Sequence, residues 1–457
     1  MFPARAAASG SASRRERRLA GLVTPPNPAS KLPRSRPFIP LLKPAGGRCN
    51  LRCRYCYYRE KTALYKGSDF RMSEAVLDAT LAQLLDAHAG GHATVAWQGG
   101  EPAVLGVPFY ARAARLVERH RTPGTKVETT FQTNGSLIDA AWVRFFAAHD
   151  VLVGLSVDGP PEFHDRWRVD GRGRGSHPHQ AAALLRAGRV RTNGICTVNA
   201  TNVTHPLRVY RHLRDDLALR FLQFIPVLHP TEAAITGEAW GEFLVAILEE
   251  WRQRDAGEVY VQNLEATLAG LVGHPPLTCV SARQCGRNPV VEHTGDVYAC
   301  DAAVDPAHLL GNVLRTPLGS LVESLRQREF GAGKADLSSE CRGCTALAAC
   351  WGGCPLTRRG SGALDAEAAT GDGTPANACS ADGGGAGTPD GARGRARAAA
   401  GRGAGQRGAS PPANAGAGGS WETPASGFCS APGPDPLCAG TRRLWGALVG
   451  GARNVDN

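Results

Sequence analysis

The 457-residue sequence lacks any run of about 18 or more apolar residues, so we expect no segment of it to span a membrane. Residues 1–36 lack the apolar stretch of a secretory signal, and their eight Lys and Arg residues stand against a single Glu. We expect a disordered basic extension there, which supplies most of the net charge of +11. No long basic stripe interleaved with aromatic residues follows, which argues against nucleic acid as a partner.

Residues 359–430 have few large apolar side chains and consist mostly of Gly, Ala, Pro, Ser and Thr. Such a composition cannot bury enough apolar surface to offset the entropy lost on ordering. We therefore expect a low-complexity disordered insert, or an artefact of the gene model, between the folded residues 37–358 and a final folded segment at 431–457.

Within residues 37–358, short apolar runs alternate with patterns typical of helices. The runs expected to form strands are 37–43, 93–98, 126–133, 151–158, 194–200 and 219–225. Helices are expected at 72–89 with Ser73 as N-cap, at 107–120, 139–149, 178–189 and 205–216, and over most of 226–275. This alternation predicts an α/β fold with a parallel sheet, open or curled into a partial barrel, whose active site lies at the carboxyl ends of the strands.

Three cysteines, Cys49, Cys53 and Cys56, follow the first expected strand in a C-x3-C-x2-C spacing. No fourth cysteine comes until Cys196, which lies in an apolar strand and is expected to be a buried core thiol. A structural zinc site or a fully ligated four-iron cluster needs four protein ligands. Three thiolates would leave one iron open to a small molecule, which that iron could chelate and reduce.

A second cysteine-rich zone contains seven cysteines: Cys279, Cys285, Cys300, Cys341, Cys344, Cys350 and Cys354. The C-x2-C pair in this zone has the spacing of a thiolate metal site. Since no secretory signal is expected, metal ligation explains this zone better than a disulfide scaffold does.

The C-x3-C-x-Tyr-C motif, together with WQGGEP at 97–102, resembles the radical S-adenosylmethionine (radical SAM) superfamily. The resemblance implies a partial (β/α)6 TIM-type barrel over 37–230 and a [4Fe–4S] cluster on the three cysteines, with S-adenosylmethionine on the fourth iron. Reductive cleavage would then give methionine and a 5′-deoxyadenosyl radical. The residues it implies for cofactor binding are Tyr55, Gln98, Gly99, Gly100, Glu101 and Ser156.

The later cysteines resemble the SPASM extension of radical SAM enzymes, which implies two auxiliary [4Fe–4S] clusters in 279–358 after a helical connection at 231–278. The resemblance supplies an eighth ligand from PLCAGTRRLWGAL, namely Cys438, for which Cys379 and Cys429 are weaker alternatives. By the family pairing, the nearer cluster takes Cys279, Cys285, Cys300 and Cys354. The outer cluster takes Cys341, Cys344, Cys350 and Cys438.

The segments LLKPAGGRCNLRCRYCYY, FQTNGSLID, VGLSVDGPPEFHD and VYACD resemble the anaerobic sulfatase-maturating enzymes. This implies hydrogen abstraction from Cβ of a Cys or Ser in a sulfatase, which becomes Cα-formylglycine. Asp301 matches the proposed base, and Tyr58 matches a residue near the substrate side chain. The expected partners are an unfolded or nascent sulfatase and a flavodoxin- or ferredoxin-type electron donor, and the chain is expected to be a cytoplasmic monomer.

Two other functions use the same cysteines. A SPASM-type maturase would modify a ribosomally made peptide by a thioether or carbon–carbon crosslink or by epimerisation. A non-enzyme would be a multi-cluster electron carrier or a homologue that only binds peptide. The open-iron triad and GGEP argue against a simple carrier, which needs neither.

Overall fold

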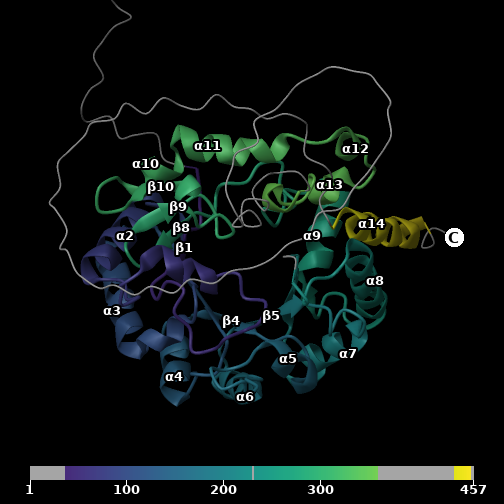
Figure 1. Cartoon of the computed structure of the whole chain (residues 1–457), viewed down its shortest axis with the longest axis horizontal. Coiled ribbons are helices and arrows are strands. Elements are labelled where there is room, and N and C mark those ends of the chain that lie inside the picture. The colour runs from purple at the N-terminus through teal and green to yellow at the C-terminus, as the bar shows by residue number, and fades with distance from the viewer. Residues whose placement is uncertain (1–35, 229–230, 359–436, 454–457) are drawn as a thin grey trace, which may run out of the picture. The chain divides into compact units, whose positions relative to one another are not determined.

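The computed structural model describes residues 36–228, 231–358 and 437–453 (Figure 1). Residues 1–35 of the expected basic extension and the whole low-complexity insert, with Cys379 and Cys429, lie outside the described residues. Among the helices that are described, none is both long and apolar enough to cross a membrane.

The six predicted strands are all present and form a continuous parallel arrangement in chain order. They are β1 (Leu41–Lys43), β2 (His92–Trp97), β3 (Lys126–Thr133), β4 (Leu152–Ser156), β5 (Thr192–Val198) and β6 (Phe221–Pro226). Their carboxyl ends share one edge of the sheet, where parallel α/β folds place their active sites. The prediction of an α/β fold with a parallel sheet is confirmed.

Four further strands make this a ten-stranded mixed sheet. They are β7 (Tyr260–Val261), β8 (Val290–Glu292), β9 (Asp296–Tyr298) and β10 (Leu309–Asn312). β8 pairs in parallel with β1, and β9 and β10 extend that side as antiparallel strands, whereas β7 lies at the opposite side beside β6. The cysteine-rich zone therefore continues the sheet of the first part. The predicted connection at 231–278 is not wholly helical, because it contains β7.

Helices cover the outer face of the curved sheet (Figure 1). They are α2 (Glu74–Ala87), α3 (Val107–His120), α4 (Ala140–Ala148), α5 (Pro161–Trp167), α6 (His179–Ala187), α7 (Pro206–Arg211) and α8 (Gly237–Arg254). Ser73 is the N-cap of α2 as predicted, and its side chain accepts a hydrogen bond from the Val76 N–H at 3.3 Å. The helix expected at 205–216 is α7 followed by a π-helical turn at His212–Asp216, and α5 was not predicted.

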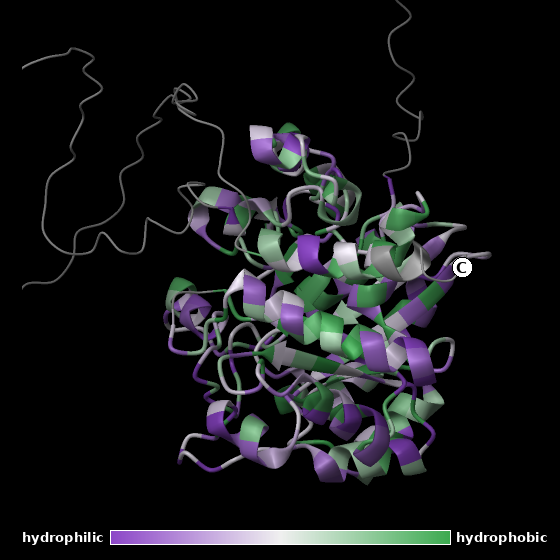
Figure 2. Ribbon diagram, turned by 90° about the vertical axis from the view of Figure 1, so that its right-hand side faces the viewer, coloured by the Kyte–Doolittle hydropathy of each residue, from purple (hydrophilic) through white to green (hydrophobic). Residues whose placement is uncertain are grey.

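The core fills the space between the sheet and these helices, where hydrophobic residues gather (Figure 2). Phe131 of β3 is 1% exposed, and its ring lies 4.9 to 5.2 Å from the rings of Tyr110, Trp142 and Phe146. Aromatic contacts of this kind add to the free energy gained from burial. They fix the position of β3 relative to the helices, and with it the position of the residues that follow β3.

The helices in the later part of the chain are α9 (Gln262–Leu271), α10 (Leu318–Val322), α11 (Leu325–Ala332), α12 (Ser339–Arg342), α13 (Leu347–Cys350) and α14 (Cys438–Arg453). α14 packs on α8 through two glycines. A Cβ added to Gly241 would lie 2.7 Å from the Gly440 Cα, and one added to Gly440 would lie 2.4 Å from the Gly237 carbonyl oxygen. Only glycine permits this approach, which places Cys438 beside the other cysteines.

Candidate active site

The predicted cofactor residues come together at the carboxyl ends of the strands. Cys49 lies in the loop after β1, Gln98 to Glu101 follow β2, Asn134 follows β3, and Ser156 ends β4. The parallel arrangement brings these four loops to one edge of the sheet.

The loop that carries the three cysteines is held by hydrogen bonds to its first thiol. The Cys49 Sγ accepts from the Leu51 N–H at 3.3 Å and from the Asn134 side-chain amide at 3.8 Å. Burial raises the pKa of Cys49 to about 12 and that of Cys53 to about 11, and charges on Cys53 and Cys56 act on Cys49 in the same direction. Since thiolates are the form that binds iron, metal binding here must displace protons.

The two glycines of WQGGEP bring the loop after β2 against the loop after β1. The Gly100 N–H donates to the Gly46 carbonyl at 2.8 Å, and the Glu101 N–H donates to the Arg48 carbonyl at 2.9 Å. Gly99 has a φ of +125°, which disfavours any other residue, and a Cβ at Gly100 would lie 2.1 Å from the Arg48 oxygen. The glycines are thus needed for contact between two loops of the chain. Their contact with S-adenosylmethionine stays a prediction.

Replacing Gly100 with alanine is expected to lower the free energy of unfolding by roughly 2–4 kcal/mol, because the new methyl group collides with backbone that cannot turn away. Anaerobic urea unfolding followed by circular dichroism measures this loss. Gly446→Ala is the matched control, since a Cβ there meets nothing within 4 Å. A Gly100 variant as stable as that control contradicts the packing argument.

Glu101 is 1% exposed, and both of its carboxylate oxygens accept hydrogen bonds from the chain. Oε1 accepts from the Ala103 N–H and the Thr133 hydroxyl, each at 2.9 Å, and Oε2 accepts from the Asn134 N–H at 2.7 Å. Burial nevertheless raises its pKa to about 7. Glu101 therefore ties the end of β3 to the loop after β2, and its predicted contact with the cofactor stays untested.

The raised pKa of Glu101 predicts a stability that depends on pH. Protonated Glu101 stabilises the fold fully below the ordinary carboxyl pKa of 4.5, and this contribution, roughly 3 kcal/mol, is lost as the pH rises through about 7. Urea unfolding of the unsubstituted protein should therefore give a lower free energy of unfolding at pH 8 than at pH 5. Glu101→Gln should lack this part of the difference. Equal pH dependence in both proteins rules out Glu101 as its source.

Tyr55, predicted to lie beside the adenine, is anchored by a buried ion pair. Its hydroxyl donates to Oδ2 of Asp158, which is 0% exposed and also accepts from the Arg168 Nε at 3.0 Å. Ser156, predicted to contact S-adenosylmethionine, is two residues before this aspartate and buried. The ion pair fixes the ring of Tyr55 and places a guanidinium near Cys53, whose pKa it lowers against the larger effect of burial.

Asp301, the predicted base, is held by one side chain from β1 and one from the loop of the first three cysteines. Its Oδ1 lies 2.6 Å from the ammonium of Lys43, the last residue of β1, and its Oδ2 accepts from the Tyr57 hydroxyl at 2.6 Å. The same ammonium donates to Gln98 Oε1 at 3.4 Å. The structure thus joins the predicted base, a predicted cofactor residue and the cysteine loop in one cluster.

Tyr58, predicted to lie near the substrate, is 4% exposed. Its hydroxyl donates to the buried Glu292 at the end of β8, and the Lys43 ammonium lies 4.4 Å from the centre of its ring. These contacts connect Tyr58 to the pairing of β1 with β8, and its role toward substrate stays a prediction.

Seven of the later cysteines lie near one another in two groups, and the ligand sets that the resemblance implied stay a prediction. Burial raises the pKa of Cys300 to about 12 and of Cys285 to about 11, and charges on Cys279 and Cys354 raise both further. Burial likewise raises the pKa of Cys350 to about 11, here with Cys344 and Cys438 as the neighbouring thiols. Cys196, by contrast, is 0% exposed within β5, which confirms it as a core thiol.

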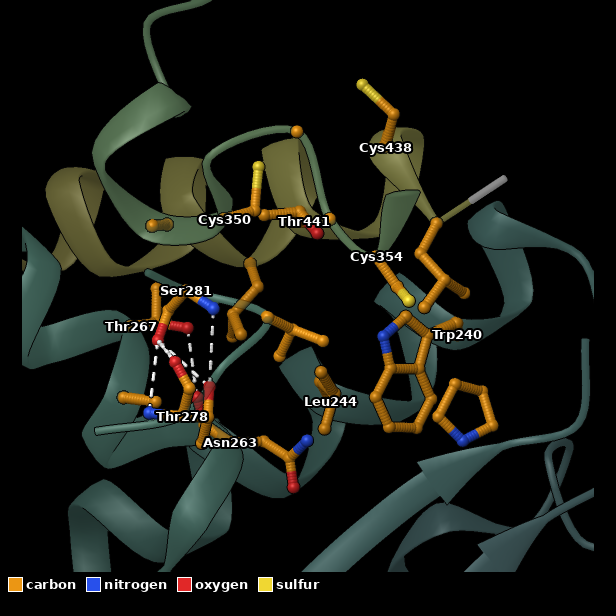
Figure 3. Close-up of a pocket in the computed structure, with 18 of the residues that line it drawn as sticks. Trp240, Leu244, Asn263, Thr267, Thr278, Ser281, Cys350, Cys354, Cys438 and Thr441 are labelled. Carbon is orange, nitrogen blue, oxygen red and sulfur yellow. Dashed lines mark hydrogen bonds between the residues drawn. The ribbon is translucent and has the colours of Figure 1, made fainter. Parts of the chain in front are cut away.

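A cavity of about 390 Å³ is lined by residues of β6, α8 and α9 together with the segments that carry the later cysteines. Six cysteines border it: Cys279, Cys341, Cys344, Cys350, Cys354 and Cys438. Figure 3 shows Cys350 and Cys354 on one segment and Cys438 on α14, with the sulfur of Cys354 pointing toward Trp240. A thiol-lined, mostly apolar cavity suits iron–sulfur clusters. Within the described ranges no three His, Cys, Asp or Glu side chains are arranged to hold a single metal ion, whereas a four-iron cluster binds each thiolate to a different iron.

Sequence reasoning did not single out Lys43, Tyr57 or Asn134, and it gave no role to the Asp158–Arg168 pair that anchors Tyr55. A lysine that ends an otherwise apolar parallel strand was the clearest available signal, because a buried charge requires a partner. No comparable pattern in the neighbouring sequence indicates the contacts of Tyr57 and Arg168.

Two family models match the chain. The radical SAM superfamily model covers residues 44–206, and the SPASM iron–sulfur cluster-binding domain model covers residues 279–345. These matches coincide with the two parts of the chain in which the structure brings cysteines together.

Relatives of known name extend over both parts. A serine-type anaerobic sulfatase-maturating enzyme of Bacteroides thetaiotaomicron is 33% identical over 351 residues, which covers 71% of this chain and 84% of the relative. The chain belongs to the anaerobic sulfatase-maturating enzyme family. A serine-type member from Klebsiella aerogenes is 36% identical over 73% of this chain and 84% of its own, and a cysteine-type member from Clostridium perfringens is 30% identical over 70% and 90%. S-adenosylmethionine and [4Fe–4S] clusters are accordingly cofactors of this radical SAM enzyme.

A solved structure of the family, native anSMEcpe with bound AdoMet and the Kp18Cys peptide, superposes with a TM-score of 0.71 at 25% identity, over 92% of this chain and 99% of that one. Streptococcus suis SuiB bound to its precursor peptide SuiA has a TM-score of 0.51 at 14% identity, a likeness of fold alone.

Proposed function

We propose that this chain oxidises a Cys or Ser side chain of a sulfatase polypeptide to Cα-formylglycine. The observation that carries the proposal is Asp301, whose carboxylate is held by Lys43 and Tyr57 beside the first cysteine loop. Serine- and cysteine-type family members both match the chain, so either residue is a candidate substrate.

The bound cofactors would supply the radical that removes a hydrogen atom and would accept one electron. Cys49, Cys53 and Cys56 are proposed to hold the cluster that takes S-adenosylmethionine, with Tyr55, Gln98 to Glu101 and Ser156 around it. The eight later cysteines are proposed to hold two auxiliary clusters. This assignment fits the convergence of thiols in the structure.

Asp301 is proposed to take the proton of the substrate thiol or hydroxyl. Loss of one hydrogen atom from Cβ, this proton and one electron leaves a C=S or C=O double bond. Serine gives the aldehyde directly, whereas cysteine gives it after water replaces the sulfur, which departs as hydrogen sulfide. The ammonium of Lys43 holds Oδ1, so Oδ2, which accepts from the Tyr57 hydroxyl, is the oxygen proposed to take the proton.

We propose that the reducing electron comes from a flavodoxin- or ferredoxin-type donor, that the chain acts as a monomer, and that it works in the reducing cytoplasm, where thiolate-bound iron survives. Size-exclusion chromatography under argon and donor-dependent turnover test the first two points.

The test of the function is a peptide assay. The full chain, reconstituted anaerobically with iron and sulfide, is given reductant, S-adenosylmethionine and a peptide containing C-T-P-S-R or its Ser version. A hydrazine-trapped aldehyde matched by 5′-deoxyadenosine supports the proposal and reports which residue is accepted. Deoxyadenosine formed without any change in either peptide overturns the substrate assignment, and a crosslinked or epimerised peptide points to a peptide maturase.

A further inference from the structure

A lysine lies fully buried in the cysteine-rich zone without a carboxylate. Lys334 is 0% exposed, and among the described residues it forms no ion pair with Asp or Glu. Its ammonium instead donates to the backbone carbonyls of Gly353 (2.7 Å), Val280 (3.1 Å), Trp351 (3.1 Å) and Cys350 (3.4 Å). Carbonyl dipoles satisfy the donors but do not balance the charge, and an unbalanced buried charge is costly.

A second buried cation shares this arrangement. Arg358 is 3% exposed and donates to the carbonyls of Lys334 (2.6 Å), Asp336 (2.7 Å), Gly352 (2.9 Å) and Trp351 (3.2 Å). In the part of the chain that the structure describes, it too has no carboxylate partner. Two positive charges therefore sit in one small region, where repulsion alone would oppose their burial.

The carbonyls that receive these cations belong to an unusual turn. Trp351, Gly352 and Gly353 have φ values of 45°, 74° and 71°, three left-handed residues in succession. The left-handed region costs a residue with a side chain about 1–2 kcal/mol, so Trp351 needs compensation. Its carbonyl accepts from both cations, which supplies that compensation.

The same turn divides the two sets of cysteines. Cys350, before the turn, has Cys344 and Cys438 as its neighbouring thiols, whereas Cys354, after it, lies near Cys285 and Cys300. Lys334 lies between the sets, because its ammonium donates to the Cys350 carbonyl before the turn and to the Gly353 carbonyl just ahead of Cys354. Burial, with a smaller effect of Arg358, lowers the pKa of Lys334, and negative charge on Cys285, Cys350 and Cys354 opposes this shift. Iron binding would convert the cysteines on either side to thiolates, and these would then supply the missing negative charge.

We propose that Lys334 and Arg358 are positioning residues of the two auxiliary clusters. They hold the Cys350–Cys354 turn so that its two cysteines serve different clusters, and they place a positive charge between those clusters. The proposal rests on the proposed ligand assignment but does not depend on the sulfatase substrate. A cation near a cluster stabilises the reduced form, because reduction adds negative charge. Lys334 then keeps the auxiliary potentials high enough to accept the electron released by the substrate.

The test compares Lys334→Gln, which keeps hydrogen-bond donors but loses the charge, with Lys334→Arg, which keeps the charge. Lys126→Gln, at the exposed start of β3, is the control. The full-length chain is reconstituted anaerobically, its iron is counted, and the auxiliary potentials are measured by a redox titration monitored by electron paramagnetic resonance. S-adenosylmethionine is present to mark the signal of the first cluster.

Lys334→Gln is expected to shift the auxiliary potentials to more negative values, or to lose the iron of an auxiliary cluster while still cleaving S-adenosylmethionine. Lys334→Arg and the control should keep wild-type values. The proposal is overturned if Lys334→Gln keeps full iron and unchanged potentials, or if the Arg variant shifts as far as the Gln variant. Should Lys334→Gln fail to fold, Arg358→Gln is judged by the same two measurements. No readout involves the peptide, so failure of the proposed substrate leaves this result interpretable.

Discussion

Replacing Cys53 with alanine is expected to abolish the formation of 5′-deoxyadenosine. Two thiolates cannot hold a four-iron cluster that already lacks one protein ligand, so the iron content should fall from about twelve to about eight atoms per chain. Iron analysis of the reconstituted protein and chromatography of the nucleoside products measure both effects.

Cys196→Ala is the matched control for this loss. Cys196 is buried within β5 and its removal should cost about 1 kcal/mol of stability through the small cavity left, with full iron and full cleavage. A Cys53 variant that still cleaves S-adenosylmethionine would falsify the assignment of the triad.

Asp301→Asn is expected to slow formylglycine formation by about 10²–10⁴-fold, because an amide cannot take the substrate proton. Iron content and the cleavage of S-adenosylmethionine without peptide should be retained, since the asparagine has the same shape and the cysteines are unchanged. Rates of aldehyde formation and of deoxyadenosine release, measured on the same samples, separate the two steps.

Asp305→Asn provides the comparison four residues away. Asp305 caps the short 3-10 helix Pro306–His308 by accepting a hydrogen bond from the His308 N–H. It should leave the rate of aldehyde formation unchanged. Full activity in Asp301→Asn shows that another group takes the proton, and Tyr57, which shares Oδ2, becomes the first candidate.

Local patterns were sufficient to predict the six strands of the first part and the Ser73 cap, because both depend on residues close in sequence. Cysteine spacing also indicated which thiols gather together. The resemblance to a family supplied the pairing of these thiols, which spacing alone leaves open.

Contacts between distant segments could not be predicted in this way. The ion pair of Lys43 with Asp301 joins residues far apart in the sequence, and it forms only because β8 aligns beside β1. β7 to β10 have two to four residues each, too few to show an alternating pattern. The glycines of WQGGEP were expected to serve the cofactor, yet their close neighbours here are backbone atoms of Gly46 and Arg48.

The parallel pairing of β1 with β8 also bears on how the chain is made. Leu41 and Val290 are register partners roughly 250 residues apart, a separation that raises the contact order and slows folding. During synthesis, β1 emerges early and presents an open edge until β8 leaves the ribosome, and open edges invite aggregation. A fragment that ends before the second group of cysteines would keep that edge permanently. The edge of β1 is therefore covered only when the segment that bears Asp301 has been made. The nascent chain cannot form the ion pair of Lys43 with Asp301 before that point.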